Sequence, residues 1–150
     1  MNEKYMREAL ALAQEAYGMD EVPVGAVIVC NGEIIARACN ERESTADATA
    51  HAEVLAIRRA CEKLGRWRLS DCELYVTLEP CPMCAGAIVN AKLGAVYYGA
   101  KDSRGGAFGS IMNFCSYPLY HRPKVLGDIL EEEGLALIRS FFEQKRNEKN

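Results

Sequence analysis

The sequence predicts an α/β fold in which helices cover a sheet of mixed strand direction. Residues 24–30 form a nearly continuous apolar run of the kind that builds a buried strand. The dipeptide Asn31-Gly32 follows and favours a type I′ turn, so residues 33–38 are expected to return as an antiparallel partner. From residue 50 onward, helical and strand-like segments alternate, which is typical of parallel strands joined by helices.

The first helix is expected over residues 3–17, ahead of the hairpin, and Gly18 ends it. Its apolar side chains recur at helical spacing: Met6, Leu10, Ala13 and Tyr17. After the hairpin, residues 39–49 are polar and are expected to form a loop.

The second half alternates helices and strands. One helix is expected over residues 50–64 and ends at Gly65, and the next begins at Pro82 and continues over 85–91. The other expected elements are strands over 73–78, 95–98 and 124–127, a glycine-rich loop over 101–110, a helical turn around Met112, and a last helix over 130–146. The last helix is expected to face inward with Leu135, Ile138, Phe141 and Phe142.

This arrangement also predicts where a ligand binds. Right-handed crossovers place the helix starts near Ala50 and Cys81 at one edge of the sheet. In open α/β sheets, ligands bind beyond the carboxyl ends of the strands, which is that edge.

Length and composition narrow the class of protein. A chain of 150 residues is expected to form one domain, residues 1–150, and no apolar run approaches the ~20 residues that cross a bilayer. Without a signal-peptide pattern, a cytoplasmic protein is expected. Of the seven cysteines, five are expected to fill the core of a protein in a reducing compartment: Cys30, Cys39, Cys61, Cys72 and Cys115. The net charge of -3 gives no overall attraction to nucleic acid.

The motif His51-Ala52-Glu53 is weak alone. In mid-helix these two side chains would point to nearly opposite sides, whereas at a first turn they reach a common point. The functional interpretation therefore requires His51 at the helix start. The alternative for Glu53 is a first-turn carboxylate that interacts with the helix dipole.

The motif Pro80-Cys81-Pro82-Met83-Cys84 places two cysteines on one face of a helix start, where they chelate one ion and where the helix dipole favours thiolates. Two other interpretations stay open. A redox pair needs a thioredoxin-like setting, and a structural zinc site needs four protein ligands.

Together the motifs favour a catalytic zinc site. His51, Cys81 and Cys84 supply three ligands and leave the fourth tetrahedral position for water. A structural site would need a fourth protein ligand: the chain has only one other histidine, His121, and Cys39 and Cys72 lack chelate spacing with the other ligands. One nitrogen and two sulfurs suit zinc, with iron or another ion as the alternative. Glu53 is then expected to take a proton from the water and to deliver protons to a ring nitrogen and the departing amino group.

These residues resemble the zinc deaminases of the cytidine/deoxycytidylate type. The resemblance is closer to bacterial tRNA-specific adenosine deaminases and covers residues 5–146. The matching segments are residues 21–27, 49–53, 67–69, 74–87 and 105–106, with Phe141-Phe142 and Arg146 near the end. The resemblance implies a three-layer α/β/α, cytidine deaminase-like fold with a mixed five-stranded sheet. It also implies a homodimer, one Zn²⁺ per subunit, and conversion of adenosine to inosine at the wobble position of the tRNA anticodon loop.

The resemblance further implies two substrate-binding residues. It places Asn40 in the pocket, hydrogen-bonded to the target nucleoside, although the residues alone favour a plain turn residue. It places Asp102 near the bound RNA loop, with a solvated loop charge as the alternative. The chain departs from the family at Tyr120, where similar tRNA enzymes carry an asparagine, and in the preceding residues 114–119. This departure bears on the RNA contacts and not on the chemistry.

Other functions remain open on the sequence alone. A deaminase of a free base or nucleoside, of the guanine or cytosine type, would use the same metal site and would fit the lack of a basic excess. A non-catalytic zinc-binding module would leave Glu53 without a role. The tRNA hypothesis needs a local basic surface, for which the candidates are Lys101, Arg104, Arg122, Lys124, Lys145, Arg146 and Lys149.

Overall fold

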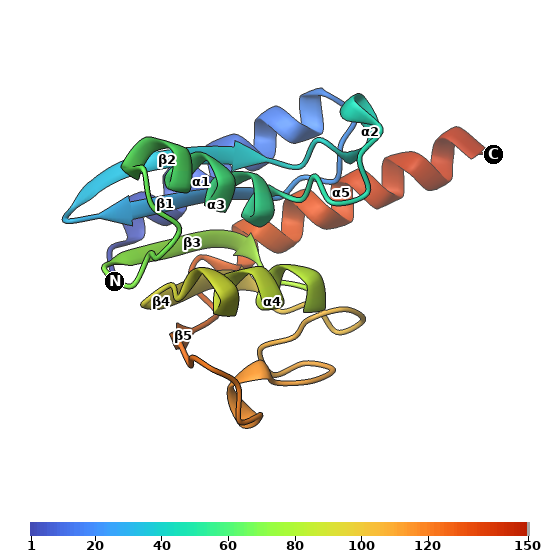
Figure 1. Ribbon diagram of the computed structural model, residues 1–150. Coiled ribbons are helices and arrows are strands. Elements are labelled where there is room, and N and C mark those ends of the chain that lie inside the picture. The colour runs from blue at the N-terminus through green and yellow to red at the C-terminus, as the bar shows by residue number, and fades with distance from the viewer. Residues whose placement is uncertain (150) are drawn as a thin grey trace.

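The computed structural model describes residues 1–149, which form a five-stranded sheet in the order β2-β1-β3-β4-β5 (Figure 1). The strands are β1 (Gly25–Cys30), β2 (Glu33–Cys39), β3 (Cys72–Leu78), β4 (Ala95–Ala100) and β5 (Lys124–Leu126). β1 runs antiparallel to both β2 and β3, whereas β3, β4 and β5 are parallel to one another. The prediction of a mixed sheet with an N-terminal hairpin is confirmed.

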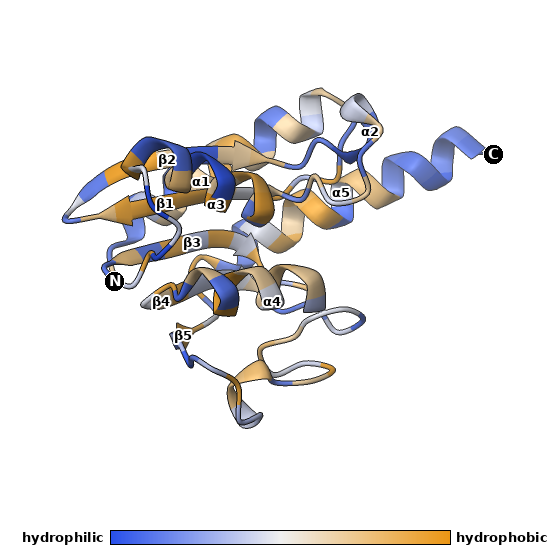
Figure 2. Ribbon diagram, in the orientation of Figure 1, coloured by the Kyte–Doolittle hydropathy of each residue, from blue (hydrophilic) through white to orange (hydrophobic). Residues whose placement is uncertain are grey.

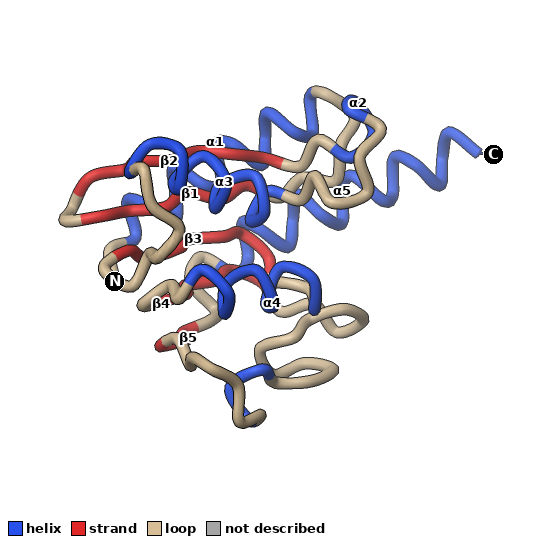
Figure 3. Tube along the Cα trace, in the orientation of Figure 1, coloured by secondary structure: helices blue, strands red, loops and turns tan. Residues whose placement is uncertain are grey.

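Helices cover both faces of the sheet, which gives three layers (Figure 3). The helices are α1 (Glu3–Gly18), α2 (Arg42–Thr45), α3 (Ala52–Leu64), α4 (Pro82–Ala91) and α5 (Glu131–Lys149), with a 3₁₀ turn η1 (Phe114–Ser116). α1 and α5 pack together on one face, and α3 and α4 pack together on the other. The predicted α/β/α architecture is therefore confirmed.

Alternation along the central strands builds the two halves of the core. Ile28 on β1 and Leu74 on β3 belong to the cluster beneath α3 and α4. Their neighbours Val27 and Tyr75 belong to the cluster beneath α1. Figure 2 shows the consequence, because the strands are predominantly hydrophobic while the end of α5 is hydrophilic. Within residues 1–149, none of the helices is long and apolar enough to span a membrane.

Several boundaries differ from the prediction. α3 begins at Ala52, two residues later than expected, and His51 is its N-cap. The segment expected to be a loop contains the one-turn helix α2, because the carboxylate of Glu21 accepts the backbone N–H groups of Glu43 and Ser44. That partner lies more than twenty residues away in the chain, so local sequence does not reveal it.

The prediction that Phe141 and Phe142 both face inward is wrong. Consecutive helical side chains point about 100° apart, so one α5 stripe does not bury both rings. Phe141 is buried against Tyr17, whereas Phe142 is 43% exposed. Of the five cysteines expected in the core, Cys61 and Cys115 are only half-buried at its margin.

Candidate metal centre

The two motifs lie at the starts of two neighbouring helices, as predicted. His51 is the N-cap of α3 and Cys81 is the N-cap of α4, each with extended backbone. Pro82 occupies the first turn of α4, where its missing N–H costs nothing. Cys84 follows in the same turn and is fully buried. The side chains of His51 and Cys81 make no capping hydrogen bond, which leaves their ligand atoms available to each other.

The imidazole and the two sulfurs converge. His51 Nδ1 lies 3.6 Å from Cys81 Sγ and 3.5 Å from Cys84 Sγ. All three ligand atoms lie within 4.8 Å of one another. In tetrahedral zinc sites the Zn–S and Zn–N distances are about 2.3 and 2.0–2.1 Å, which separates a nitrogen and a sulfur by about 3.5 Å. The spacing of this donor set therefore fits zinc without rearrangement.

The group has three protein members among residues 1–149. The candidates for a fourth ligand are elsewhere: the His121 ring bonds to the Leu93 carbonyl, Cys72 begins β3, and Cys39 ends β2. A four-ligand structural zinc site is therefore not supported by these positions.

The ligand side chains perturb one another's protonation. The hydrogen bond with Cys84 lowers the pKa of Cys81 to about 4, with a further contribution from His51. The same hydrogen bond with Cys81, together with burial, raises the pKa of the Cys84 thiol. The hydrogen bond with Cys81 raises the pKa of His51. A thiolate at a helix N-terminus is a ready ligand for a soft cation.

Glu53 lies in the first turn of α3 and is 4% exposed. Burial raises the pKa of Glu53 to about 7, and the neighbouring Cys81 contributes in the same direction. A carboxyl group with a pKa near neutrality is suited to accept and donate protons during turnover. The structure thus places the predicted proton shuttle beside the predicted metal ligands.

Asn40 joins the end of β2 to the start of α3. Its Oδ1 accepts the Ala52 N–H at 2.9 Å, and its Nδ2 donates to the Val22 carbonyl at 3.1 Å. Asn40 is only 7% exposed, and its hydrogen bond to the Ala52 N–H holds the start of the helix that His51 caps. Its predicted contact with substrate stays a prediction.

Asp102 shapes the glycine-rich loop. Its Oδ1 accepts the backbone N–H groups of Arg104 and Gly105 at 3.1 and 3.2 Å. Its own N–H donates to Glu79 Oε1 at 3.1 Å. Its predicted contact with the RNA loop also stays a prediction.

Glu79 has an organising role that the sequence analysis missed. This carboxylate is 2% exposed and accepts the backbone N–H groups of Asp102, Phe108 and Ser110 at 3.1, 3.0 and 3.2 Å. The Ser110 hydroxyl donates a further hydrogen bond. Glu79 directly follows the apolar strand β3, but its backbone donors lie 23 to 31 residues further along the chain, so no local sequence pattern signals this role.

A cleft of about 800 Å³ opens between the glycine-rich loop and α5. Its charged lining is mainly basic: Lys101, Arg104, Arg139, Lys145, Arg146 and Lys149, against Asp102 and Glu143. Arg122 and Lys124, which were also expected on a basic surface, are not among its lining residues. Of the predicted site residues, Asp102 lines this cleft, whereas His51, Glu53, Cys81 and Cys84 do not.

Known proteins share this architecture. The profile of the MafB19-like deaminase family matches residues 1–144. A tRNA-specific adenosine deaminase from Bacillus subtilis (strain 168) is 48% identical over 149 residues, which cover 99% of this chain and 92% of the relative. A structure from a study of A-to-I editing by tRNA:A34 deaminases at the wobble position of transfer RNA is 47% identical, with a TM-score of 0.89 over 91% of this chain and 99% of that one. A guanine deaminase from Bacillus subtilis is 39% identical, with a TM-score of 0.64 over 80% and 88% of the two chains.

Proposed function

The chain belongs to the tRNA-specific adenosine deaminases, within the MafB19-like deaminase family, and we propose that it hydrolyses adenosine to inosine at the wobble position of tRNA. The observation that carries this proposal is the convergence of His51, Cys81 and Cys84 beside the buried carboxyl of Glu53. In this reaction water adds at C6 of adenine and the amino group leaves as ammonia.

We assign the residues the following roles. His51, Cys81 and Cys84 would hold one Zn²⁺ per subunit, which would supply the Lewis acidity that makes water nucleophilic near neutral pH. Glu53 accepts a proton from that water and passes it to the ring nitrogen beside the reacting carbon. Glu53 then takes the remaining proton from the hydroxyl added at that carbon and donates it to the departing amino group, so the carboxyl group ends the cycle as it began.

Asn40 and Asp102 are proposed to contact the substrate. The Asn40 Nδ2 carries two hydrogens and the Val22 carbonyl takes one of them, so the other is available to a base. Asp102 uses Oδ1 for its own loop, which leaves Oδ2 to accept from the RNA. Each residue would then hydrogen-bond to the substrate while its other hydrogen bonds hold the backbone around the site in place.

The basic cleft supports an RNA substrate. The formal net charge of -3 gives no overall attraction to RNA, yet most of the charged residues that line this cleft are basic. Because phosphate contacts release counterions, binding of an anticodon stem-loop should weaken steeply as salt rises. Arg146→Gln should lower the magnitude of that salt slope by about one, whereas Lys63→Gln, at an exposed position of α3 outside the cleft, should not change it.

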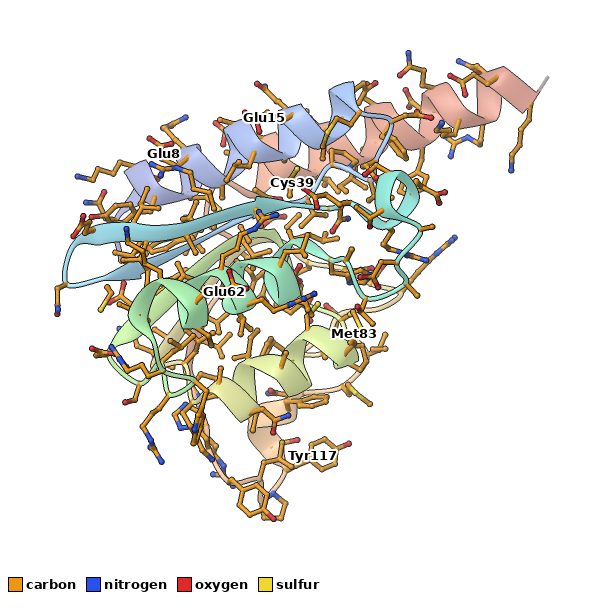
Figure 4. All side chains as sticks on the ribbon, turned by 45° about the horizontal axis from the view of Figure 1, so that its top comes forward. Glu8, Glu15, Cys39, Glu62, Met83 and Tyr117 are labelled. Atoms are coloured by element: carbon orange, nitrogen blue, oxygen red, sulfur yellow. The ribbon has the colours of Figure 1, made fainter. Side chains whose placement is uncertain are left out.

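Homodimerisation and a cytoplasmic location complete the proposal. Large apolar side chains are exposed on α4 and the segment beyond β4: Met83, Ile111, Met112, Tyr117 and Leu119. Figure 4 shows Met83 and Tyr117 on the side of the molecule opposite α1. A second copy of the chain would bury this surface. Analytical ultracentrifugation measures whether the chain is a dimer in solution.

The substrate assay compares four candidates. The zinc-loaded protein is incubated with tRNA carrying adenosine at the wobble position, and with free adenosine, guanine and cytidine in parallel. We expect inosine in the tRNA and no ammonia from the free compounds. Guanine deaminase activity is the second candidate, because a guanine deaminase structure is 39% identical. Ammonia from guanine, with adenosine in tRNA unchanged, would replace the first proposal by the second.

A further inference from the structure

A second cluster of metal-binding side chains lies at the other end of β3. Cys30 ends β1 and Cys72 begins β3, and strand register makes them direct cross-strand partners. Asp71 precedes Cys72, and the ligand atoms of the three residues lie within 4.8 Å of one another. The six steps from Cys72 to Leu78 along β3 separate this cluster from the metal centre by about 20 Å.

The distances within this cluster suit a tetrahedral cation. Cys30 Sγ lies 3.6 Å from Asp71 Oδ2, and Cys72 Sγ lies 3.6 Å from Asp71 Oδ1. Metal–sulfur and metal–oxygen distances of about 2.3 and 2.1 Å, at tetrahedral angles, separate the two donors by about 3.6 Å. The sulfurs are buried, whereas Asp71 is exposed, so an ion has a path from solvent.

Burial raises the pKa of the Cys72 thiol to about 12, which opposes cation binding, and so does the positive charge of Arg66. Its Nη2 lies 2.9 Å from both oxygens of Asp71, and its Nη1 donates to the Arg68 carbonyl. A carboxylate has about four acceptor positions, so Arg66 leaves part of the Asp71 carboxylate available. Arg66 therefore lowers the affinity for a cation but does not use all the acceptor positions of Asp71.

We propose that Cys30, Asp71 and Cys72 form a second metal site, for a thiophilic divalent cation such as Zn²⁺ or Cd²⁺. Two sulfurs and one carboxylate oxygen select a soft or borderline cation over Mg²⁺ or Ca²⁺. Binding displaces the two thiol protons to solvent and leaves the oxidation state of sulfur unchanged. The site is separate from the deaminase centre and does not depend on the proposed function.

The test counts metal per chain. The zinc-loaded protein is kept reduced with a phosphine, dialysed against Cd²⁺, and analysed for total zinc plus cadmium. Counting both metals makes the result independent of exchange at the first centre. The unmodified chain should hold two equivalents, Cys72→Ser one, and the control Cys115→Ser two. One equivalent in the unmodified chain, or two in Cys72→Ser, would overturn the proposal.

Two surface variants cover the case in which Cys72→Ser does not fold. Asp71→Asn should weaken the second equivalent by about tenfold or more, because it removes a ligand. Arg66→Gln should tighten it by about tenfold, because it removes an opposing charge. Unchanged affinity in both variants would exclude Asp71 as a ligand.

Discussion

Glu53 and Glu79 are both buried carboxylates two residues away in the chain from a candidate metal ligand, His51 and Cys81 respectively, but their surroundings are opposite. Glu79 is 2% exposed and accepts hydrogen bonds from three backbone N–H groups and a hydroxyl. Glu53 is 4% exposed and lies against the ligand cluster, where burial raises its pKa to about 7. Burial alone therefore does not distinguish a catalytic acid from a structural one. The number of fixed hydrogen-bond donors around the carboxylate distinguishes the two.

This difference implies opposite contributions to folding. The donors around Glu79 replace the water that it loses, so its burial stabilises the loop over residues 101–110. Glu53 lacks comparable support, so its charged form is disfavoured in the folded protein. Replacing Glu53 should consequently lower turnover with little effect on stability, whereas replacing Glu79 should mainly lower stability.

The largest expected effect is on turnover in Glu53→Gln. Loss of proton transfer should lower kcat by about 10²–10⁴-fold. Stability and zinc content should be retained, because the replacement removes a charge that burial disfavours. Single-turnover assays with tRNA, with thermal melts and metal analysis, measure both. Glu62→Gln, an exposed change on the same helix (Figure 4), is the control and should behave as the unmodified chain. Near-normal turnover in Glu53→Gln would remove the assigned role.

Glu79→Gln should show the reverse pattern. Glutamine offers one carbonyl oxygen and places an NH₂ group among N–H donors, so buried donors lose their acceptor. We expect unfolding free energy to fall by about 2–4 kcal/mol, measured by urea denaturation. Turnover should fall less than in Glu53→Gln. Full stability combined with a collapse of kcat would mean that the two acids have been assigned the wrong way round.

The convergence of His51, Cys81 and Cys84 could be predicted from sequence because its signals are local. The spacing of Cys81 and Cys84 specifies a chelate at a helix start, and the hairpin dipeptide Asn31-Gly32 sets the direction of β2. The position of His51 near these cysteines followed from the right-handedness of crossover connections, which places the two helix starts at the same edge of the sheet.

Features that depend on distant pairing could not be predicted. The donors of Glu79 lie 23 to 31 residues away in the chain. The α2 residues that donate to Glu21 lie 22 and 23 residues away from it in the chain. Cys30 and Cys72 meet only because of strand register, which a sequence pattern does not specify at a strand end. Phe142 was misplaced because helical periodicity does not choose between adjacent aromatic residues.

A smaller effect is expected when Glu79 is displaced through its neighbour. A Cβ at Gly106 would lie 2.2 Å from the Glu79 carboxyl carbon, which is pinned by its donors. Gly106→Ala should therefore cost about 1–3 kcal/mol of stability, as overpacking does. Gly86→Ala is the matched control, since nothing lies within 4 Å of its added Cβ and helix propensity favours alanine. Equal stability of the two variants in urea would show that Glu79 is free to move.

The smallest expected effect concerns Glu21, a buried acid that resembles Glu79 in its donors. Burial favours a higher pKa, but the N–H groups of Ser44 and Glu43 outweigh it and hold the pKa of Glu21 below its ordinary value. A lowered folded-state pKa stabilises the protein above the unfolded value of about 4.3, and this contribution disappears as pH falls through the folded value. Glu21→Gln should therefore be about 1 kcal/mol less stable at pH 7, with the deficit shrinking as pH falls below the unfolded value of about 4.3. Urea midpoints across this range, with exposed Glu8→Gln on α1 as the control (Figure 4), measure it. A deficit that stays constant with pH would show that the amide group, and not the lost charge, weakens α2.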